Sequence, residues 1–305
     1  MWRPSRSLGR ASTPSCNAPN HVLKVLVTGG TGLLGSGLVR LAEQRDWQVT
    51  APSHSEMDVV DLESCVRVIK SKSPDCVIHC AAFTQVDKAE MEPEQAMRVN
   101  RDGSVNVARA AVLAGSDIVH VSTDYVFDGR ATSPYGTDEP VSPLGVYATS
   151  KVAAETAVIE ETLGLVSLLI VRTGWLYGGG RRDFVDKVLE SGEAGEDLKV
   201  VDDQRGCPTW TRNAAEAVLD LIDLEISGTM NVSDAGETTW CEFARAVLDT
   251  AGINSTVEGV SSRSFGAPAR RPSYSVLDLD ETELALQRKM MPWQKALRLY
   301  LRERS

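Results

Sequence analysis

The clearest regularity along the chain is an alternation of short apolar runs with longer segments that have helical spacing. The β-branched run Val22–Thr28 predicts a strand, and a glycine-rich turn follows it at once. Residues 33–44 then place leucines on one face of a predicted helix. The same patterns predict further strands at 48–51, 76–80, 118–122 and 167–172, and helices at 63–72, 93–113 and 147–163. Five such alternations with short connections predict an α/β fold of the Rossmann type, a doubly wound parallel sheet with helices on both faces.

The rhythm weakens after Arg172. Helical spacing returns at 184–192, 211–222 and 240–251, short strands are predicted at 199–201 and 228–232, and the end from residue 281 mixes helix and loop. We interpret this part as a smaller α/β substrate-binding lobe. The expected division is a dinucleotide-binding domain at 22–175, with later segments near 199–226 returning to it, and a mainly substrate-binding lobe at 176–305.

Residues 1–21 differ from the rest, since they carry three arginines, several Ser and Pro, and no acid. A disordered tail or a start site assigned too early explains this composition more simply than a transit peptide does.

The overall composition argues against several classes of partner. Hydrophobic residues make up 42% and charged residues 24%, as in an ordinary soluble protein, and the net charge of -10 argues against nucleic acid. No apolar stretch is long enough to span a membrane. The six cysteines form no CxxC pair and the four histidines are scattered, so no metal site is predicted and a reducing, cytoplasmic location is expected. The sequence leaves open whether the protein is a monomer or a homodimer.

The turn after the first predicted strand has the spacing GxxGxxG, with Gly29, Gly32 and Gly35. In this setting the first glycine permits a tight turn, the second lets the backbone approach a pyrophosphate, and the third lets the helix lie close to the sheet. The helix N-terminus adds N–H donors for an anion. A plain strand-to-helix turn is the alternative, but the position near the chain start favours a dinucleotide site.

The end of the second predicted strand bears on the choice of cofactor. Residues 51–54 contain no carboxylate that would repel a 2′-phosphate, so NADPH is favoured. They contain no arginine either, so NADH remains possible. Asp58 is a candidate to accept a hydrogen bond from the adenine amine, with an ordinary loop or capping acid as the alternative.

A candidate proton relay follows from two further segments. Tyr147 and Lys151 stand at i and i+4, on one face of a predicted helix, and a neighbouring ammonium is expected to lower the pKa of a tyrosine. Thr123 ends a predicted core strand, and ligands bind beyond the carboxyl ends of parallel strands. Thr123 is therefore expected to hold a substrate oxygen, with a turn cap as the alternative, while Tyr147 supplies a proton.

Several motifs together carry a family resemblance from about residue 24 to the C-terminus. They are TGGTGLLG from residue 28, AAFTQVDKAE from 81, STDYVFDG from 122, YATSK from 147, RTGWLY from 172, DQRGCPT from 203 and ARRP from 269. The chain resembles the extended short-chain dehydrogenase/reductase superfamily and, within it, the dTDP-4-dehydrorhamnose reductase family. The resemblance implies NADPH-dependent reduction of the 4-keto group of dTDP-4-dehydro-L-rhamnose.

The resemblance also implies roles for individual residues. The implied catalytic residues are Thr123, Tyr147 and Lys151. The implied cofactor-binding residues are Gly29, Thr31, Gly32, Leu33, Leu34, Gly35, Asp58, Val59, Ala81, Ala82, Thr84, Tyr147 and Lys151. The implied substrate-binding residues are Val86, Thr123, Asp124, Tyr125 and Trp175. Cys80 stands where the family usually has Ala, and Gly174 where it often has Ser, which leaves the reaction class intact.

Two other functions remain open at this point. One is a 4-ketoreductase for a different nucleotide-linked deoxysugar. The other is a non-catalytic regulatory subunit like the beta subunit of methionine adenosyltransferase, which resembles these reductases. The complete set of Thr123, Tyr147, Lys151 and Trp175 favours an enzyme. Arg270 and Arg271 are candidates to bind a diphosphate, with a surface ion pair equally possible.

Overall fold

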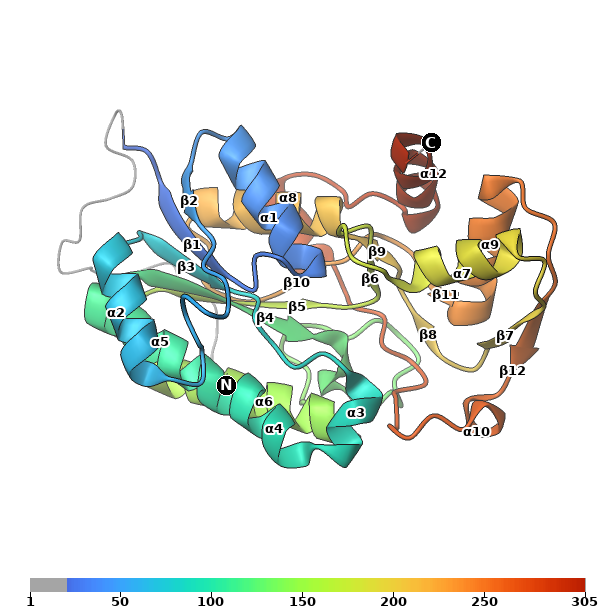
Figure 1. The fold of residues 1–305 in the computed structure, drawn as a ribbon, viewed down its shortest axis with the longest axis horizontal. Helices are drawn as coiled ribbons and strands as arrows, with labels where there is room; N and C mark the ends of the chain where they lie inside the picture. The colour runs from blue at the N-terminus through green and yellow to red at the C-terminus, as the bar shows by residue number, and fades with distance from the viewer. Residues whose placement is uncertain (1–20, 305) are drawn as a thin grey trace.

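The computed structural model describes residues 21–304, and its centre is a six-stranded parallel sheet with the order β10-β5-β4-β3-β1-β2 (Figure 1). The tail predicted at residues 1–21 lies almost wholly outside the described residues. The strands are β1 (Lys24–Thr28), β2 (Gln48–Thr50), β3 (Cys76–His79), β4 (Asp117–Thr123), β5 (Leu168–Thr173) and β10 (Gly228–Asn231). This architecture confirms the predicted Rossmann-type fold class.

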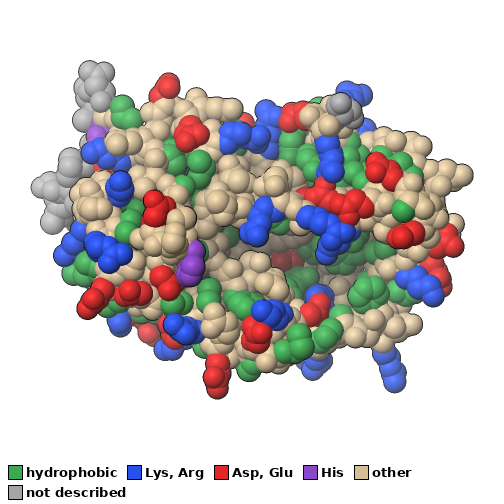
Figure 2. Space-filling view, viewed as in Figure 1, with side chains coloured by type: hydrophobic (Ala, Val, Ile, Leu, Met, Phe, Trp, Pro, Cys, Tyr) green, Lys and Arg blue, Asp and Glu red, His purple; other side chains and the backbone are tan. Residues whose placement is uncertain are grey.

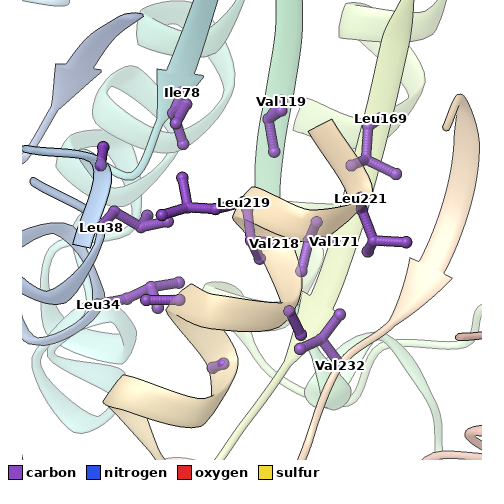
Figure 3. Packing of buried hydrophobic residues seen from close by; sticks show 14 of the residues in the cluster. Leu34, Leu38, Ile78, Val119, Leu169, Val171, Val218, Leu219, Leu221 and Val232 are labelled. Atoms are coloured by element: carbon purple, nitrogen blue, oxygen red, sulfur yellow. The ribbon is translucent and has the colours of Figure 1, made fainter. Parts of the chain in front are cut away.

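Helices cover both faces of the sheet, as Figure 1 shows. One face carries α1 (Leu33–Gln44) and α8 (Thr211–Asp223), and the other carries α2 (Leu62–Lys72), α5 (Gly103–Ala114) and α6 (Val146–Thr162). Alternate residues of each strand feed the two cores: Val25 and Val27 pack with α1 and α8, whereas Leu26 packs with α2 and α5. Figure 3 shows the α8 side chains Val218 and Leu219 lying between α1 and the strands.

The predicted long helix at 93–113 is interrupted. It consists of α4 (Pro93–Met97), a π-helical turn η1 (Arg98–Asp102) and α5. The wide turn directs Asn100 inward, where its side chain accepts from the Phe83 N–H (2.7 Å) and donates to the Ser150 hydroxyl (2.8 Å). A tertiary contact therefore overrides the regular helix here. The short helix α3 (Val86–Met91) was not predicted.

A further apolar core, separate from the two on the faces of the sheet, lies beyond the carboxyl ends of the strands. It is built by α7 (Phe184–Glu193), α9 (Trp240–Ala251) and α12 (Trp293–Arg304) around aromatic side chains such as Phe243 and Trp293. Three two-stranded sheets accompany it: β7 (Leu198–Val201) with β12 (Val257–Val260), β8 (Arg205–Gly206) with β11 (Thr238–Thr239), and β6 (Leu176–Tyr177) with β9 (Thr209–Trp210). The remaining elements are η2 (Asp124–Val126), α10 (Ser262–Phe265) and α11 (Asp280–Leu286).

Segments from the second half of the chain contribute to the large sheet as well as to this separate core. The helix α8 and strand β10 pack on or extend the large sheet, whereas β7 belongs to the smaller group of strands. The division into a dinucleotide-binding domain and a substrate-binding lobe stays a prediction. Among residues 21–304, no helix has the length and apolar character needed to cross a membrane.

Candidate active site

The predicted site residues that follow strands lie where the carboxyl ends of the parallel strands face the apolar core of α7, α9 and α12. Figure 2 shows this face of the molecule hollowed between the two parts, with Lys and Arg side chains at the rim. The glycine-rich turn follows β1, Thr123 ends β4, and Trp175 lies two residues beyond β5. The crevice therefore has the position in which open parallel sheets bind ligands.

The glycine-rich turn has the geometry of a phosphate cradle. Gly29 has a φ of +66°, and a Cβ there would lie 2.8 Å from the Ala81 nitrogen. A Cβ on Gly35 would clash with the Gly29 carbonyl oxygen, so α1 can approach the turn only with glycine at that position. Gly32 is the extended N-cap residue of α1, and the first turn of the helix has no acidic side chain. These features fit a pyrophosphate group at the helix N-terminus.

The other predicted cofactor residues differ in what they expose to a ligand. Leu34 is buried in the core, so only its backbone is available to a ligand, whereas Thr31 and Thr84 are exposed. Ala81 abuts Gly29. The other three are the half-buried Leu33 and Ala82 and the buried Val59. The Asp58 carboxylate accepts a hydrogen bond from the Val60 N–H (3.1 Å), as an ordinary loop acid does.

Thr123 and Tyr147 are brought together, as the sequence predicted. Thr123 is the N-cap residue of η2, where its oxygen accepts from the Tyr125 N–H (3.2 Å) and its hydroxyl donates to Asp124 Oδ1 (3.1 Å). Tyr147 lies close enough to the Thr123 side chain for Thr123 to lower its pKa. The capping alternative is thus true as well, but it leaves the Thr123 hydroxyl beside the tyrosine.

The electrostatics of the relay differ from the expectation. Loss of hydration raises the pKa of Tyr147 to about 12, and the Thr123 side chain opposes this rise. The predicted lowering by Lys151 was wrong for this structure, because the Lys151 ammonium donates to the Val121 carbonyl oxygen (2.7 Å). Burial lowers the pKa of Lys151 itself to about 8, against a smaller opposing effect of Glu155.

Asp124 is a buried acid held by hydroxyl groups. Its Oδ2 accepts from the Ser275 hydroxyl (2.6 Å), a partner that the sequence analysis did not single out. Burial raises the pKa of Asp124 to about 6. A Cβ at Gly174 would clash with this carboxylate, so the glycine that departs from the family pattern makes room for Asp124.

Tyr125 links the relay to a distant segment. Its ring meets the Tyr147 ring edge-on, with centroids 6.4 Å apart, and its hydroxyl lies near the Arg271 guanidinium, which acts to lower the pKa of Tyr125. The Arg271 guanidinium is forked onto the Asp87 carboxylate by two hydrogen bonds of 2.9 Å. Asp87 follows the predicted substrate residue Val86 at the start of α3. Arg271 therefore forms an ion pair within the protein, and Arg270 is exposed.

Trp175 is buried in an uncommon backbone conformation. Its φ is +53°, and its indole stacks on Trp240 with ring centroids 3.6 Å apart. A Cβ on Gly206 would clash with the edge of the indole. Since Trp240 covers one face of Trp175, only its other face is left for the predicted contact with a sugar or base.

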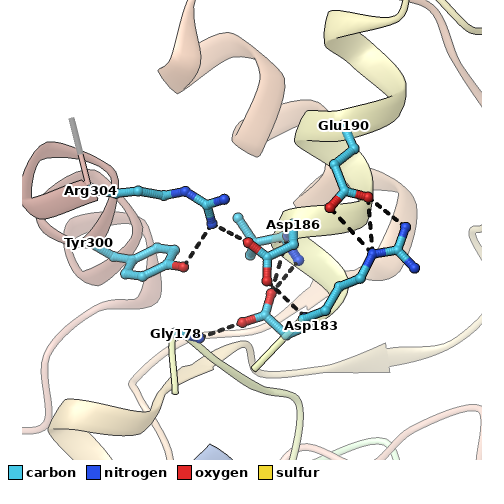
Figure 4. Close-up of polar contacts among 8 residues, drawn as sticks. Gly178, Asp183, Asp186, Glu190, Tyr300 and Arg304 are labelled. Carbon is cyan, nitrogen blue, oxygen red and sulfur yellow. Dashed lines mark hydrogen bonds and ion pairs between the residues drawn. The ribbon is translucent and has the colours of Figure 1, made fainter. Parts of the chain in front are cut away.

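The loop after β6 is fastened next to the phosphate cradle. The Ser36 hydroxyl of α1 donates to the Gly179 carbonyl oxygen (2.7 Å), and the Gly178 N–H donates to Asp183 (2.6 Å). Figure 4 shows Asp183 bonded to Asp186, which in turn pairs with Arg304 of α12. The loop thus connects α1, which packs on the large sheet, to helices α7 and α12.

Comparisons with known proteins agree with this geometry. The family model described as "RmlD substrate binding domain" matches residues 23–305. A dTDP-4-dehydrorhamnose reductase from Streptomyces griseus is 38% identical, over 89% of this chain and 91% of that protein. The chain belongs to the dTDP-4-dehydrorhamnose reductase family. The family assignment made from the sequence motifs is confirmed, and with it the reaction class, an oxidoreductase.

Two further proteins are similar to this chain over nearly their whole length. The spore coat polysaccharide biosynthesis protein SpsK of Bacillus subtilis is 38% identical, over 92% of this chain and 98% of that protein. The crystal structure of dTDP-4-dehydrorhamnose reductase from Bacillus anthracis in complex with NADP has a TM-score of 0.89 and 33% identity, and the match covers 93% of this chain and 100% of that one.

Proposed function

We propose that the protein reduces the 4-keto group of dTDP-4-dehydro-L-rhamnose to give dTDP-L-rhamnose, with NADPH as the preferred cofactor and NADH as a possible one. The observation that carries the proposal is the contact between Thr123 and Tyr147 at the carboxyl end of β4, beside a glycine turn shaped for a pyrophosphate. The nucleotide cofactor supplies the hydride. The NADP complex of the Bacillus anthracis relative supports the choice of cofactor.

Each residue of the relay has a defined task. Tyr147 donates its proton to the oxygen that develops negative charge at sugar C4, and the Thr123 hydroxyl holds the same oxygen. Lys151 places an ammonium within the buried site, near Cys80 and Glu155. Asp124, Tyr125, Val86 and Trp175 are the residues proposed to contact the substrate.

The sugar is the least constrained part of the proposal. A 4-ketoreductase for another nucleotide-linked deoxysugar is the second candidate. The similarity to SpsK, whose name specifies a polysaccharide but no sugar, supports it. We propose a cytoplasmic enzyme that is a monomer or a homodimer, with neither nucleic acid nor membrane as partner.

The deciding experiment mixes the purified protein with dTDP-4-dehydro-L-rhamnose and follows the absorbance of NADPH, then of NADH. Formation of dTDP-L-rhamnose supports the proposal. The Tyr147→Phe variant should lose activity by about 100-fold or more, while it binds NADPH as the wild type does. Wild-type turnover in that variant would refute the role of Tyr147. Cofactor binding without any oxidation would favour another sugar or the regulatory function.

A further inference from the structure

A carboxylate lies at the end of β2, where the sequence showed none. Residues 51–54 contain no acid, but the chain turns back directly afterwards, with the Glu56 and Met57 N–H groups donating to the Ser53 carbonyl oxygen (3.1 and 3.0 Å). This turn brings Glu56 Oε2 to within 2.8 Å of both the Ser53 nitrogen and the Ser53 hydroxyl oxygen. Both Ser53 donors are therefore occupied by one carboxylate.

The turn lies beside the phosphate cradle. The strands β1 and β2 pair in parallel up to Leu26 and Thr50, so β2 ends on the same side of the sheet as the glycine turn. A Cβ on Gly30 would lie 2.8 Å from the Ala51 Cβ, which shows that the two backbones meet there. In a dinucleotide-binding sheet this is the place that receives the adenosine ribose and, in NADPH, its 2′-phosphate.

The local charge is negative. Residues 51–66 contain Glu56, Asp58, Asp61 and Glu63 but no Lys or Arg. His54 lies 3.8 Å from Asp58 and is the one basic side chain of this stretch. Outside the stretch, the Lys72 ammonium at the end of α2 acts on Glu56, with a smaller effect on its pKa than the hydrogen bonds from Ser53. The hydrogen bonds from Ser53 lower the pKa of Glu56, so that Glu56 is ionised at neutral pH.

We propose that Glu56 determines the specificity for the cofactor ribose: its carboxylate occupies the two Ser53 donors that a 2′-phosphate would use, repels that phosphate, and accepts a hydroxyl of an unphosphorylated ribose. The inference rests on the proposed function only in that it requires a nicotinamide dinucleotide in the cradle. NADPH must displace Glu56 from Ser53 before its phosphate can bind there, whereas NADH need not. Glu56 thus keeps NADH usable in a site that otherwise has no residue to select it.

Calorimetric titration of the full chain with NADP⁺ and with NAD⁺ tests this without any sugar substrate. Glu56→Gln removes the charge at nearly constant size, and Glu63→Gln, an exposed acid in the first turn of α2, is the matched control. In Glu56→Gln, the Kd for NADP⁺ should fall by about fivefold to tenfold at low salt, the range expected for a like charge a few ångströms away. The Kd for NAD⁺ should stay the same or rise slightly. The gain should shrink in 1 M salt, since that screens the repulsion.

The outcomes separate the inference from the proposed function. An unchanged ratio of the two Kd values in Glu56→Gln, or an equal gain in Glu63→Gln, overturns the role of Glu56 while the reductase assignment stands. If the wild-type chain binds neither dinucleotide, the proposed function fails, and this inference fails with it.

Discussion

The ion pair between Asp87 and Arg271 is expected to influence catalysis without touching the substrate. Arg271 contacts Tyr125 as well as Asp87, and the Tyr125 ring lies edge-on to Tyr147. The Ala269 N–H also donates to the Asp87 carboxylate (3.1 Å), so this one acid fixes two points of the segment at 269–271. Loosening the pair should therefore let Tyr125 and then Tyr147 shift.

The size of the effect follows from geometry and exposure. The pair has the two-bond geometry of a strong Arg–carboxylate contact. However, the Arg271 side chain is 18% exposed and the Asp87 side chain 43% exposed, so solvent weakens the interaction. A coupling of about 1 kcal/mol is appropriate for such a pair. Asp87→Asn also leaves the half-buried Arg271 without its counter-charge, which adds to the loss. We expect kcat/KM to fall by about tenfold, which corresponds to about 1.4 kcal/mol.

A double-mutant cycle measures this coupling. Asp87→Asn, Arg271→Gln and the double variant are compared by steady-state kinetics with the keto-sugar, and by calorimetry with NADP⁺. Most of the loss should appear in kcat and should be non-additive, whereas the Kd for NADP⁺ should change less than twofold. Tyr125→Phe, which removes only the hydroxyl near Arg271, should reproduce part of the loss. Strictly additive single variants, or an unchanged kcat, would refute a positioning role for the pair.

Three further predictions concern the cradle, the core and the pH response. Gly35→Ala should weaken NADP⁺ binding by about tenfold or more in calorimetry, because a Cβ at this position meets backbone atoms of the glycine turn. The control Gly136→Ala, in open surroundings, should bind NADP⁺ as the wild type does, and equal affinities of the two variants would contradict the phosphate cradle. Glu155→Ala should lower the free energy of unfolding in urea by about 3–5 kcal/mol, because it leaves the buried Arg172 unpaired; a loss near zero would show that water replaces the carboxylate. The pKa of Asp124 is raised to about 6, so protonation of this carboxyl favours the folded state. The wild type should therefore lose stability relative to Asp124→Asn as the pH rises from about 4 to 6, and an unchanged difference in the free energy of unfolding in urea across that range would contradict the shift.

The large sheet was predictable because its strands are covered on both faces. Each of the predicted strands in the first part of the chain exists, with ends that differ by one or two residues from those expected. Continuous apolar runs between glycine turns are the direct sequence record of such burial. Helix α1 was predicted with its true limits, since the glycine turn sets its start and leucines mark its inner face.

Features that depend on contacts between distant segments were not predictable. Asp87 and Arg271 are 184 residues apart, and nothing in either segment names the other as its partner. Two-residue strands such as β8 and β11 have no period to detect, because their pairing alone defines them. Glu56 is a different case: the Ser-x-x-Glu spacing of Ser53 and Glu56 is a known signal for a side chain that turns back onto a backbone N–H. Glu56 lies two residues beyond the stretch at 51–54 in which a carboxylate was expected.

The arrangement of protons at the relay favours reduction. The Thr123 hydroxyl donates its single proton to Asp124, and it would have to turn towards Tyr147 to stabilise a phenolate there. One lone pair of the Thr123 oxygen is taken by the Tyr125 N–H. Burial raises the pKa of Tyr147 to about 12, so the phenol keeps its proton at neutral pH beside the Thr123 side chain. A carbonyl oxygen that Thr123 holds, as proposed, is then next to a protonated tyrosine. The site is thus prepared to give a proton, as reduction of a ketone requires, and oxidation of the product would first have to remove that proton.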